Sequence, residues 1–204
     1  MTERHLHWET IYQNKEFEAC SWYQDIPKTS LELIAALELQ KDAAIIDVGG
    51  GESYLTAFLD KKGFSQLSVL DISPTALKKS QKKMGGKAAK VTWIVSDVTH
   101  FETERHYDLW HDRATFHFLR DPEDITAYIA TAGRRVRSGG YAIIGTFSPQ
   151  GPTRCSGITI QQYSIDALAE CFKADFDLIA SQENSHQTPF DTKQAFSFCT
   201  FQRK

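Results

Sequence analysis

The sequence predicts an α/β fold, in which a doubly wound, mostly parallel seven-stranded sheet carries helices on both faces and ends in a C-terminal antiparallel hairpin. Apolar, β-branched segments alternate with segments of helical spacing through most of the chain, as in βαβ units. A run of three glycines joins the first of these strands to its helix. Two alternating segments, 176–183 and 195–202, close the chain with a polar stretch between them, and they predict the hairpin.

The size and composition of the chain indicate a single domain. Its 204 residues are 41% hydrophobic and 24% charged, which is ordinary for a globular protein with a sizeable core. The formal net charge of −3 provides no overall attraction to nucleic acid, so we do not expect a nucleic-acid partner. The charged first residues, MTERHLHWET, and the lack of a long apolar run predict neither a signal peptide nor a membrane span, and therefore a cytoplasmic protein without membrane partners.

The first strand of the predicted sheet leads into a glycine turn. An apolar segment, 43–46, is followed by Gly49, Gly50 and Gly51 and then by a segment of helical spacing. Glycines take positive φ and let a ligand approach bare backbone, while the following helix presents unpaired amides, so the pattern indicates a nucleotide-type ligand. A tight turn without a ligand is the alternative. Tyr54 stands where a dinucleotide-binding turn needs a small residue, and no GK[ST] follows, so both phosphate-binding motifs are disfavoured.

Acidic residues stand at the ends of three predicted strands. Asp47 follows the first strand, Asp71 ends the strand 66–71, and Asp97 follows the strand 90–95. In a parallel sheet these ends share one edge, where open α/β sheets bind ligands, and a carboxylate at the position of Asp71 can accept hydrogen bonds from two ribose hydroxyls. The alternative for Asp71 is a role in a helix-capping turn.

Capping residues and apolar spacing predict four helices outside the glycine turn. The predicted starts are Thr29 or Ser30, Ser73–Pro74, Asp121–Pro122 and Ser164. The second helix is expected to run to about Met84. The third is expected to include Val136 and to be closed by Gly139 and Gly140, before a fifth strand at 141–148.

The fourth predicted strand, 107–111, runs into a cluster of polar side chains. His111, Asp112, Arg113 and His117 follow one another closely at its carboxyl end. A histidine there can support a ligand through hydrogen bonds or act as a general base, and the sequence does not decide between these roles.

The cysteines show no metal-binding pattern. Cys20, Cys155, Cys171 and Cys199 are scattered, without a CxxC pair or a histidine at metal-ligand spacing, so neither a metal site nor a disulfide framework is expected. Cys155 lies in the polar loop 148–157, a position that allows an exposed and reactive thiol, although a chemical role is the less favoured interpretation.

The pattern Asp47, Gly49, Gly51 resembles motif I of the class I methyltransferases that use S-adenosylmethionine, with Ser53 where many members carry another glycine. The stretch HWETIYQ, 7–13, is similar to a signature near the start of a group that includes the smaller lysine methyltransferases. The resemblance covers the chain from about residue 7 to its end.

This resemblance implies S-adenosyl-L-methionine as cofactor, a lid segment at 1–40 and a Rossmann-like methyltransferase domain at 41–204. The aromatic residues of the first segment, Trp8, Tyr12 and Trp22 among them, then serve as lid contacts, although they can also simply attach an N-terminal extension. The residues implied in cofactor binding are Tyr12, Trp22, Asp47, Gly49, Gly50, Gly51, Asp71, Ile72, Asp97, Val98 and His111.

The same resemblance implies that His111, Asp112, Arg113 and His117 lie beside the reactive methyl group and are the candidate catalytic residues. We expect transfer of the methyl group to a nitrogen, sulfur or oxygen atom of a small molecule. A protein lysine is the second expectation, because of the signature in the lid segment. A non-catalytic module that only binds the cofactor is the third.

Overall fold

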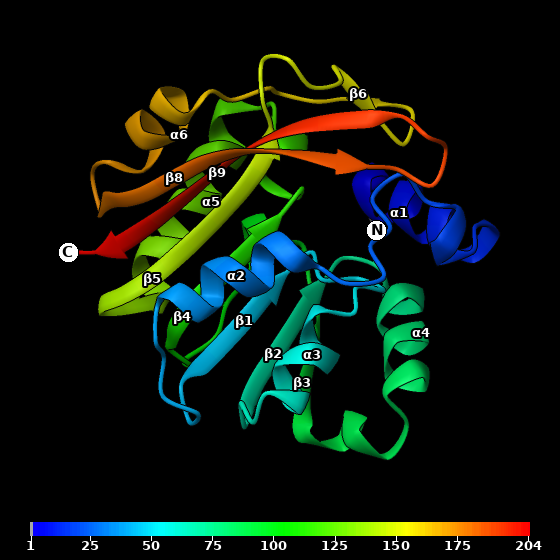
Figure 1. The fold of residues 1–204 in the computed structure, drawn as a ribbon, viewed down its shortest axis with the longest axis horizontal. Helices are drawn as coiled ribbons and strands as arrows, with labels where there is room; N and C mark the ends of the chain where they lie inside the picture. Colours follow the sequence, from blue (N-terminus) through cyan, green and yellow to red (C-terminus); the bar gives the residue numbers. More distant parts are fainter. Residues whose placement is uncertain (1) are drawn as a thin grey trace.

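The computed structural model describes residues 2–204 and has the predicted α/β architecture (Figure 1). Seven strands form one sheet in the order β3-β2-β1-β4-β5-β9-β8, in which β1 to β5 pair in parallel and β9 pairs antiparallel with both β5 and β8. The strands of this sheet are β1 (Ala44–Val48), β2 (Gln66–Asp71), β3 (Val91–Val95), β4 (Tyr107–Arg113), β5 (Val136–Phe147), β8 (Phe176–Gln187) and β9 (Lys193–Arg203). The parallel strands and the terminal hairpin confirm the fold class.

Helices cover both faces of the sheet. They are α1 (Glu3–Asn14), α2 (Lys28–Ala36), α3 (Leu55–Lys61), α4 (Pro74–Met84), α5 (Pro122–Arg135) and α6 (Ile165–Phe172), with short 3-10 helices η1 (Phe17–Ala19), η2 (Gly85–Lys90), η3 (Val98–His100) and η4 (Phe116–Phe118). Figure 1 shows α2 and α3 in front of the sheet and α5 behind it. Each face therefore has its own apolar core, one around Trp110, Tyr128 and Phe172 and the other around Ile34 and Leu55.

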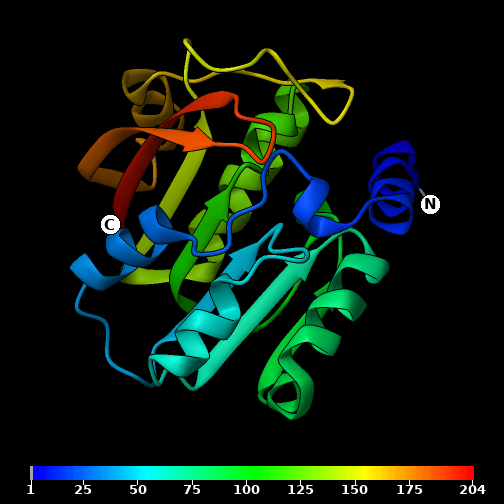
Figure 2. The same ribbon diagram turned by 45° about the vertical axis from the view of Figure 1, so that its right-hand side comes forward.

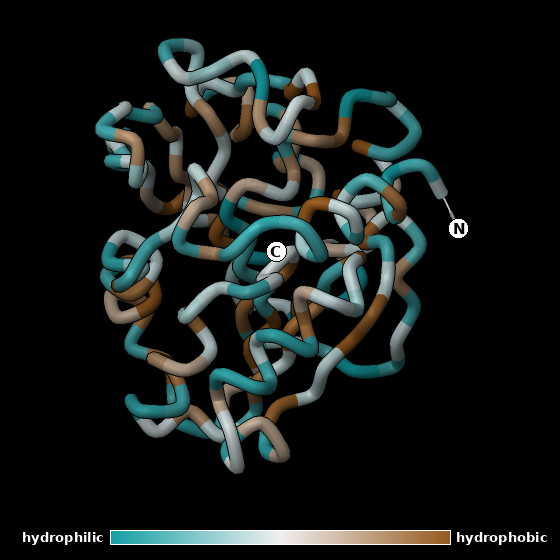
Figure 3. The backbone as a smooth tube through the Cα atoms, turned by 90° about the vertical axis from the view of Figure 1, so that its right-hand side faces the viewer, coloured by the Kyte–Doolittle hydropathy of each residue, from teal (hydrophilic) through white to brown (hydrophobic). Residues whose placement is uncertain are grey.

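The hydrophobic segments of the backbone lie mostly inside the molecule, and its outer turns are mostly hydrophilic (Figure 3). Between residues 2 and 204, no helix has both the length and the apolar character needed to cross a membrane.

Local capping residues predicted several helix and strand boundaries correctly. Both β2 and α4 have the predicted bounds, and the Ser73 hydroxyl accepts a hydrogen bond from the Ala76 amide at 3.1 Å. Ser164 caps α6 in the same way, accepting from the Ala167 amide at 3.1 Å. These caps satisfy helix amides within a few residues, so their energy depends little on the rest of the fold.

The predicted end of the third capped helix was wrong. Helix α5 ends at Arg135, and Val136 already belongs to β5, where it pairs with Tyr107 of β4. Val136 is β-branched and fits a strand, and a ladder partner is available at the point where the helical spacing still continues. Gly139, with φ of +79°, lies within the strand and does not close the helix.

The capping prediction for α2 was also wrong. The helix begins at Lys28 after Pro27, and both predicted caps lie in its first turn. Their hydroxyls instead bond distant partners: Thr29 accepts from Asn184 Nδ2 at 2.6 Å, and Ser30 bonds His111 Nε2 at 2.9 Å. In α2, long-range hydrogen bonds of the two hydroxyls therefore take the place of the predicted local capping bond.

Helix α1 and a short hairpin in the loop after β5 are among the elements that were not predicted. Helix α1 occupies the aromatic N-terminal segment, with the Thr2 hydroxyl accepting from the His5 amide at 3.3 Å, and it packs against α4. The polar loop after β5 contains a short hairpin of β6 (Arg154–Cys155) and β7 (Ile158–Thr159). Figure 2, turned from the first view, shows α1 standing beyond the end of the parallel strands.

Candidate functional site

The glycine turn after β1 forms one wall of a cavity at the carboxyl ends of the parallel strands. Gly49 has φ of +64° and Gly51 has φ of +45°, which is the left-handed region that favours glycine. A Cβ on Gly49 would lie 1.8 Å from the hydroxyl oxygen of Thr115. A Cβ on Gly51 would lie 2.5 Å from the Tyr12 hydroxyl and 3.1 Å from Asp71 Oδ2. Only bare backbone therefore fits between these groups.

Asp47, Asp71 and Asp97 all line this cavity, and we call these three residues the acidic edge. They come from β1, β2 and the turn after β3, three neighbouring strands of the sheet. The cavity has a volume of about 1120 Å³ including the space open to solvent at its mouth, which is enough for a small organic ligand. The edge predicted from the order of the strands is therefore present as one continuous surface.

Most of the residues implied in cofactor binding meet in this cavity. Its lining includes Tyr12, Trp22, Gly49, Gly50, Ile72, Val98 and His111 in addition to the acidic edge. Gly51 does not line it, although its place in the turn brings it against Tyr12 and Asp71. The structure thus gathers these residues around one cavity.

Asp71 is a buried carboxyl group at the end of β2. Its Oδ1 accepts a hydrogen bond from the Ser73 amide at 2.8 Å. Burial raises its pKa to about 7, although hydrogen bonds from the amides of Ser73, Gly51 and Ile72 act in the opposite direction. A raised pKa of this kind means that the hydrogen bonds from the protein do not fully replace the solvation that the carboxylate loses on burial.

His111 joins the acidic edge to helix α2. Its Nδ1 lies 2.8 Å from Asp47 Oδ1, and its Nε2 lies 2.9 Å from the Ser30 hydroxyl, with the ring only 2% exposed. With Nδ1–H donating to the carboxylate, Nε2 accepts from the hydroxyl, and neither nitrogen is left to take a proton from a ligand. This geometry favours the supporting role over the general base.

Asp112 points to the opposite face of β4 and does not line the cavity. Its carboxylate accepts from the amides of Thr115 at 2.8 Å and Phe116 at 3.0 Å and from the Tyr128 hydroxyl at 2.5 Å. Burial raises its pKa to about 6. Successive strand residues alternate between faces, which is why Asp112 stabilises the turn after β4 and lies away from the predicted catalytic position.

His117 was also predicted beside the reactive group, but it lies behind the cavity wall. Its ring is fully buried, and Nδ1 accepts from the Phe147 amide at 3.2 Å, so the proton is on Nε2. Burial, with a smaller effect of Arg113, lowers its pKa to about 3. A base with so low a pKa removes protons poorly near neutral pH, which argues against the predicted role.

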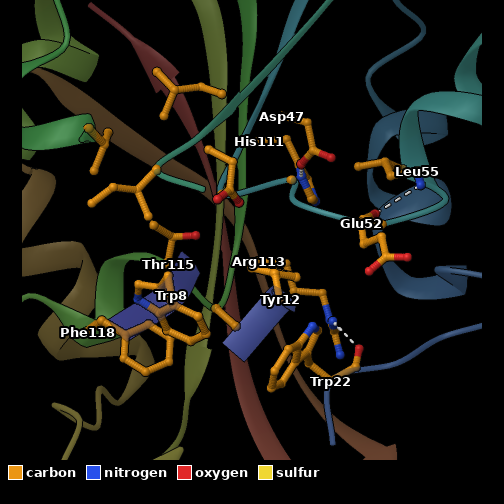
Figure 4. A pocket seen from close by; sticks show the side chains of 18 of the residues that line it. Trp8, Tyr12, Trp22, Asp47, Glu52, Leu55, His111, Arg113, Thr115 and Phe118 are labelled. Carbon is orange, nitrogen blue, oxygen red and sulfur yellow. Dashed lines mark hydrogen bonds and ion pairs between the residues drawn. The ribbon is translucent and has the colours of Figure 1, made fainter. Parts of the chain in front are cut away.

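Arg113 does line the cavity, and Figure 4 shows it close to Tyr12 and Trp22. Its Nη1 donates to the Trp22 carbonyl at 3.1 Å, and its guanidinium lies over the Phe196 ring at 5.1 Å from the centroid. Burial lowers its pKa to about 10, so it remains charged at neutral pH. Of the four predicted catalytic residues, His111 and Arg113 reach the cavity.

Helix α1 is fastened over the acidic edge by side chains that sequence reasoning missed. Arg4 pairs with Asp97 at 2.9 Å and also contacts Asp124 of α5. Glu9 accepts from the Ser73 hydroxyl at 2.6 Å and from the amide of Thr75 at 3.2 Å. These contacts join the N-terminal segment to the ends of three distant elements, which no local pattern could indicate.

Aromatic rings complete the cavity wall. Trp8 packs edge-on against Phe118 with centroids 4.8 Å apart and against Trp22 at 6.1 Å, and Tyr12 lies 6.3 Å from both tryptophan rings. The lining is therefore largely apolar between the acidic edge and Arg113.

Cys155 is buried, so the exposed and reactive thiol that its polar loop allowed is not present. Its side chain is 8% exposed and faces the cavity from the β6–β7 hairpin, and burial raises the pKa of its thiol. A thiol with a raised pKa is a weak nucleophile at neutral pH. Over residues 2–204, no group of three His, Cys, Asp or Glu side chains is placed to hold a metal ion.

Glu52 is a further buried acid that sequence reasoning missed. It follows the glycine turn, lines the cavity and is 4% exposed. Lys83 of α4 pairs with it at 2.9 Å and Lys79 approaches to 3.8 Å. The charge of Glu52 is therefore balanced by lysines of α4. On their spacing alone, these lysines would be assigned to a solvent-exposed face of the helix.

A glycine turn, an acidic edge and an aromatic wall at the carboxyl ends of a seven-stranded, Rossmann-like sheet define a class of protein, the class I methyltransferases. The family model described as "Methyltransferase domain" matches residues 45–140, which span β1 to β5 and include Asp47, Asp71 and Asp97. Residues 45–140 therefore match a methyltransferase domain, in agreement with the Rossmann-like fold.

Individual relatives agree with this assignment. Over 87 residues the chain is 33% identical to the malonyl-[acyl-carrier protein] O-methyltransferase of Anoxybacillus flavithermus, covering 42% of this chain and 33% of that protein. It is 28% identical over 151 residues to EEF1A lysine methyltransferase 2 of Danio rerio, covering 71% and 59%. The chain thus spans between a third and three fifths of the length of these two relatives.

The N-methyltransferase NodS from Bradyrhizobium japonicum, solved in complex with S-adenosyl-L-homocysteine, has a similar structure. It superposes with a TM-score of 0.74 over 99% of each chain, at 14% sequence identity. At that identity the likeness concerns the fold.

Proposed function

We propose that the protein transfers a methyl group from S-adenosyl-L-methionine to a small molecule. The observation that carries this proposal is the acidic edge: Asp47, Asp71 and Asp97 line one cavity beside the glycine turn. The family match over residues 45–140 and the methyltransferase relatives support it.

The residues present fit this cofactor. The Asp71 carboxylate would accept hydrogen bonds from both ribose hydroxyls, because its Oδ2 carries no hydrogen bond from a side chain in the described part of the chain. Gly49, Gly50 and Asp47 would hold the methionyl part against bare backbone. Ile72 and Val98 would pack on the adenine, with Asp97 accepting from its amino group while also bound to Arg4.

The chain's own contribution to the chemistry would be positioning and exclusion of water. The sulfonium of the cofactor supplies an activated methyl group, so an aligned nucleophile needs little further activation. His111 would hold Asp47 in place through the hydrogen bond at 2.8 Å. With both ring nitrogens of His111 engaged and His117 behind the wall, the acceptor would bind deprotonated or lose its proton to water.

A small molecule is the acceptor that we favour. Helix α1 and the β6–β7 hairpin both contribute to the cavity wall, through Tyr12 and Cys155 among others, so the cavity is covered from two sides. A protein lysine is the second candidate, because the lysine methyltransferase of Danio rerio is among the relatives. A formal net charge of −3 disfavours a nucleic-acid acceptor.

Calorimetric titration tests the donor half of the proposal. We expect S-adenosylmethionine and S-adenosylhomocysteine to bind, and NAD and ATP not to bind. Asp71→Ala removes a charged acceptor from the ribose hydroxyls and should weaken binding by roughly 1.5–3 kcal/mol, while circular dichroism shows the fold intact. Binding of NAD without a response to S-adenosylhomocysteine would contradict the proposal.

Incubation with labelled S-adenosylmethionine tests the acceptor half. The protein is supplied separately with the small molecules and with the proteins of a cell extract. Label in the small-molecule fraction supports the favoured acceptor, label on lysines supports the second candidate, and donor binding without transfer in either fraction indicates a non-catalytic module.

A further inference from the structure

Arg113 lines the cavity and has no carboxylate partner in the described chain, whereas three arginines elsewhere in the fold have one. Arg4 pairs with Asp97, Arg137 with Asp108, and Arg203 with Asp175. The described chain offers Arg113 only the carbonyl of Trp22 and the face of the Phe196 ring. Its Nη2 is out of contact with solvent and has no hydrogen-bond acceptor anywhere in residues 2–204.

A charged, partly buried donor without an acceptor is costly, because the desolvation of the group is not repaid. A carbonyl and an aromatic face compensate only in part, since neither carries a negative charge. A guanidinium is shaped to bind a carboxylate, and here the edge that carries Nη2 remains available for one.

A second donor in this region also has no acceptor in the described structure. His117 Nε2 is buried and unpaired, and the positive charge of Arg113 contributes to the low pKa of the His117 ring. Two buried donors of this region therefore lack an acceptor in the described chain, and of the two residues only Arg113 lines the cavity. This arrangement is the reverse of the acidic edge, where each carboxylate accepts from the protein.

The direct contacts of Arg113 favour the acceptor side of the cavity over the adenosyl side. Its direct contacts come from Phe196 on β9 and Trp22 in the N-terminal segment. Cys155 of the β6–β7 hairpin and, with a smaller effect, Asp47 of β1 both act to raise its pKa. Asp71 and Asp97, which would hold the adenosyl group, belong to β2 and β3 on the other side of β1. Figure 4 shows Arg113 beside Trp22, with Asp47 and His111 further along the cavity.

We propose that Arg113 binds a carboxylate of the methyl acceptor, so that the substrate is a small carboxylic acid with an apolar or aromatic body. The rings of Trp8, Trp22 and Phe118 line the cavity next to the guanidinium and would receive that body. The carboxylate anchors the acceptor and sets its orientation toward the methyl group. This inference rests on the proposed methyltransferase function and names the substrate class for it.

Binding of simple acids tests the proposal directly. The probes are benzoate, phenylacetate and hexanoate, each compared with its primary amide, with S-adenosylhomocysteine saturating. The readout is the Nε–H resonance of Arg113 in a nitrogen-15 NMR spectrum, assigned by its disappearance in Arg113→Lys. We expect at least one acid to shift this resonance saturably and to bind about 10- to 100-fold more tightly than its amide, the ratio typical of a hydrogen bond to a charged group.

Matched variants separate the charge from the fold. Arg113→Gln should remove the preference for acid over amide, measured through ligand-observed saturation transfer, and Arg113→Lys should retain part of it. Arg120→Gln, an exposed arginine seven residues further along the chain, should keep the preference unchanged. Thermal melting confirms that each variant is folded, and the Lys variant retains the test if the Gln variant does not fold.

The donor also carries a carboxylate, and a second comparison excludes it as the partner. S-adenosylhomocysteine has this group and 5′-methylthioadenosine lacks it. We expect Arg113→Gln to bind both as the wild type does. Loss of affinity for S-adenosylhomocysteine alone would assign Arg113 to the donor and overturn the proposal.

The proposal also fails if no acid binds better than its amide to the wild-type protein. Failure of the methyltransferase function itself has a different signature, since S-adenosylhomocysteine would then not bind the wild-type protein at all. The two results are therefore distinguishable in the same set of titrations.

Discussion

At the acidic edge each carboxylate accepts hydrogen bonds from the protein, whereas Arg113, which lines the same cavity, has a donor without an acceptor in the described chain. Asp47 accepts from His111, Asp71 from the Ser73 amide, and Asp97 from Arg4. Arg113 Nη2 lacks such a partner within residues 2–204. The carboxylates of the acidic edge are therefore held in place by the protein itself. The free donor of Arg113 would find an acceptor only in a ligand.

The largest effect is expected from the glycine turn that supports the acidic edge. Gly49→Ala places a Cβ against the Thr115 hydroxyl at a residue with φ of +64°. We expect it to weaken S-adenosylhomocysteine binding roughly 100-fold or more and to lower the free energy of unfolding by about 1–3 kcal/mol. Titration calorimetry and urea unfolding measure the two quantities.

Gly86→Ala is the matched control for this change. Gly86 has no positive φ, and a Cβ there would have no neighbour within 4 Å. It should leave both quantities near the wild-type values. Equal affinities in the two glycine variants would show that the turn is not the ligand-binding element.

The two histidines of the region should respond differently to substitution, because His111 is hydrogen-bonded to the acidic edge and His117 is not. His111→Asn leaves Asp47 and Ser30 without their buried partner and should cost about 1–3 kcal/mol in unfolding free energy, together with donor affinity. His117→Asn should leave the donor's dissociation constant nearly unchanged, because the ring does not line the cavity.

Single-turnover measurements on the same variants distinguish support from acid–base chemistry. A general base would show the opposite pattern for His111→Asn, with intact donor affinity and a chemical step slowed by roughly 10²–10⁴. That result would require the hydrogen bonds of His111 to rearrange when the acceptor binds.

The raised pKa of Asp71 predicts a pH-dependent donor affinity. The ribose hydroxyls need the ionised carboxylate as acceptor, and a pKa of about 7 means that the protonated form predominates at lower pH. Affinity for S-adenosylhomocysteine should therefore fall as pH falls below 7, by up to about tenfold per unit, with release of a proton on binding. Asp71→Asn should bind more weakly and without this pH dependence.

The raised pKa of Asp71 also makes the free energy of unfolding depend on pH. A folded-state pKa raised from 3.8 to about 7 gives a contribution that is present at low pH and is lost as pH rises through 7. Asp71→Asn should accordingly gain stability relative to the wild type above pH 7 and not below pH 4. Urea unfolding at several pH values checks this, and a pH-independent difference between the two proteins would contradict it.

The smallest effect is expected from the contact that fastens α1 to the acidic edge. Arg4→Ala removes a partly exposed ion pair with Asp97 and Asp124 and should cost about 0.2–1 kcal/mol. Faster amide hydrogen exchange in α1, without change in the sheet, is the expected signature. Lys28→Ala, which removes an exposed pair with Glu32, is the control and should leave α1 unchanged.

The elements that sequence reasoning located well are those stabilised by neighbouring residues. Strand β2 and helix α4 were placed correctly because the Ser73 cap acts over three residues. The end of α5 was misplaced because Val136 pairs with Tyr107, a partner on another strand. Periodicity alone continues through the junction, so only the ladder tells where the helix stops.

The candidate site likewise has a part that the sequence predicted and a part that it did not. Its acidic edge follows from strand order, because the carboxyl ends of neighbouring parallel strands must meet. Which face of β4 each residue takes depends on where the strand ends, and β4 continues to Arg113, two residues beyond the predicted end. For this reason the sequence grouped Asp112 with His111, although the pleat separates them.

The sequence by itself determined the order of strands and helices, the glycine turn and the three acids at the edge of the sheet, because these depend on local conformation and on the period of apolar residues. Only the tertiary structure decided the partners of Arg113 and His111. Those partners, Trp22, Phe196 and Ser30, come from segments far away in the chain, and packing between such segments leaves no repeating pattern in the sequence.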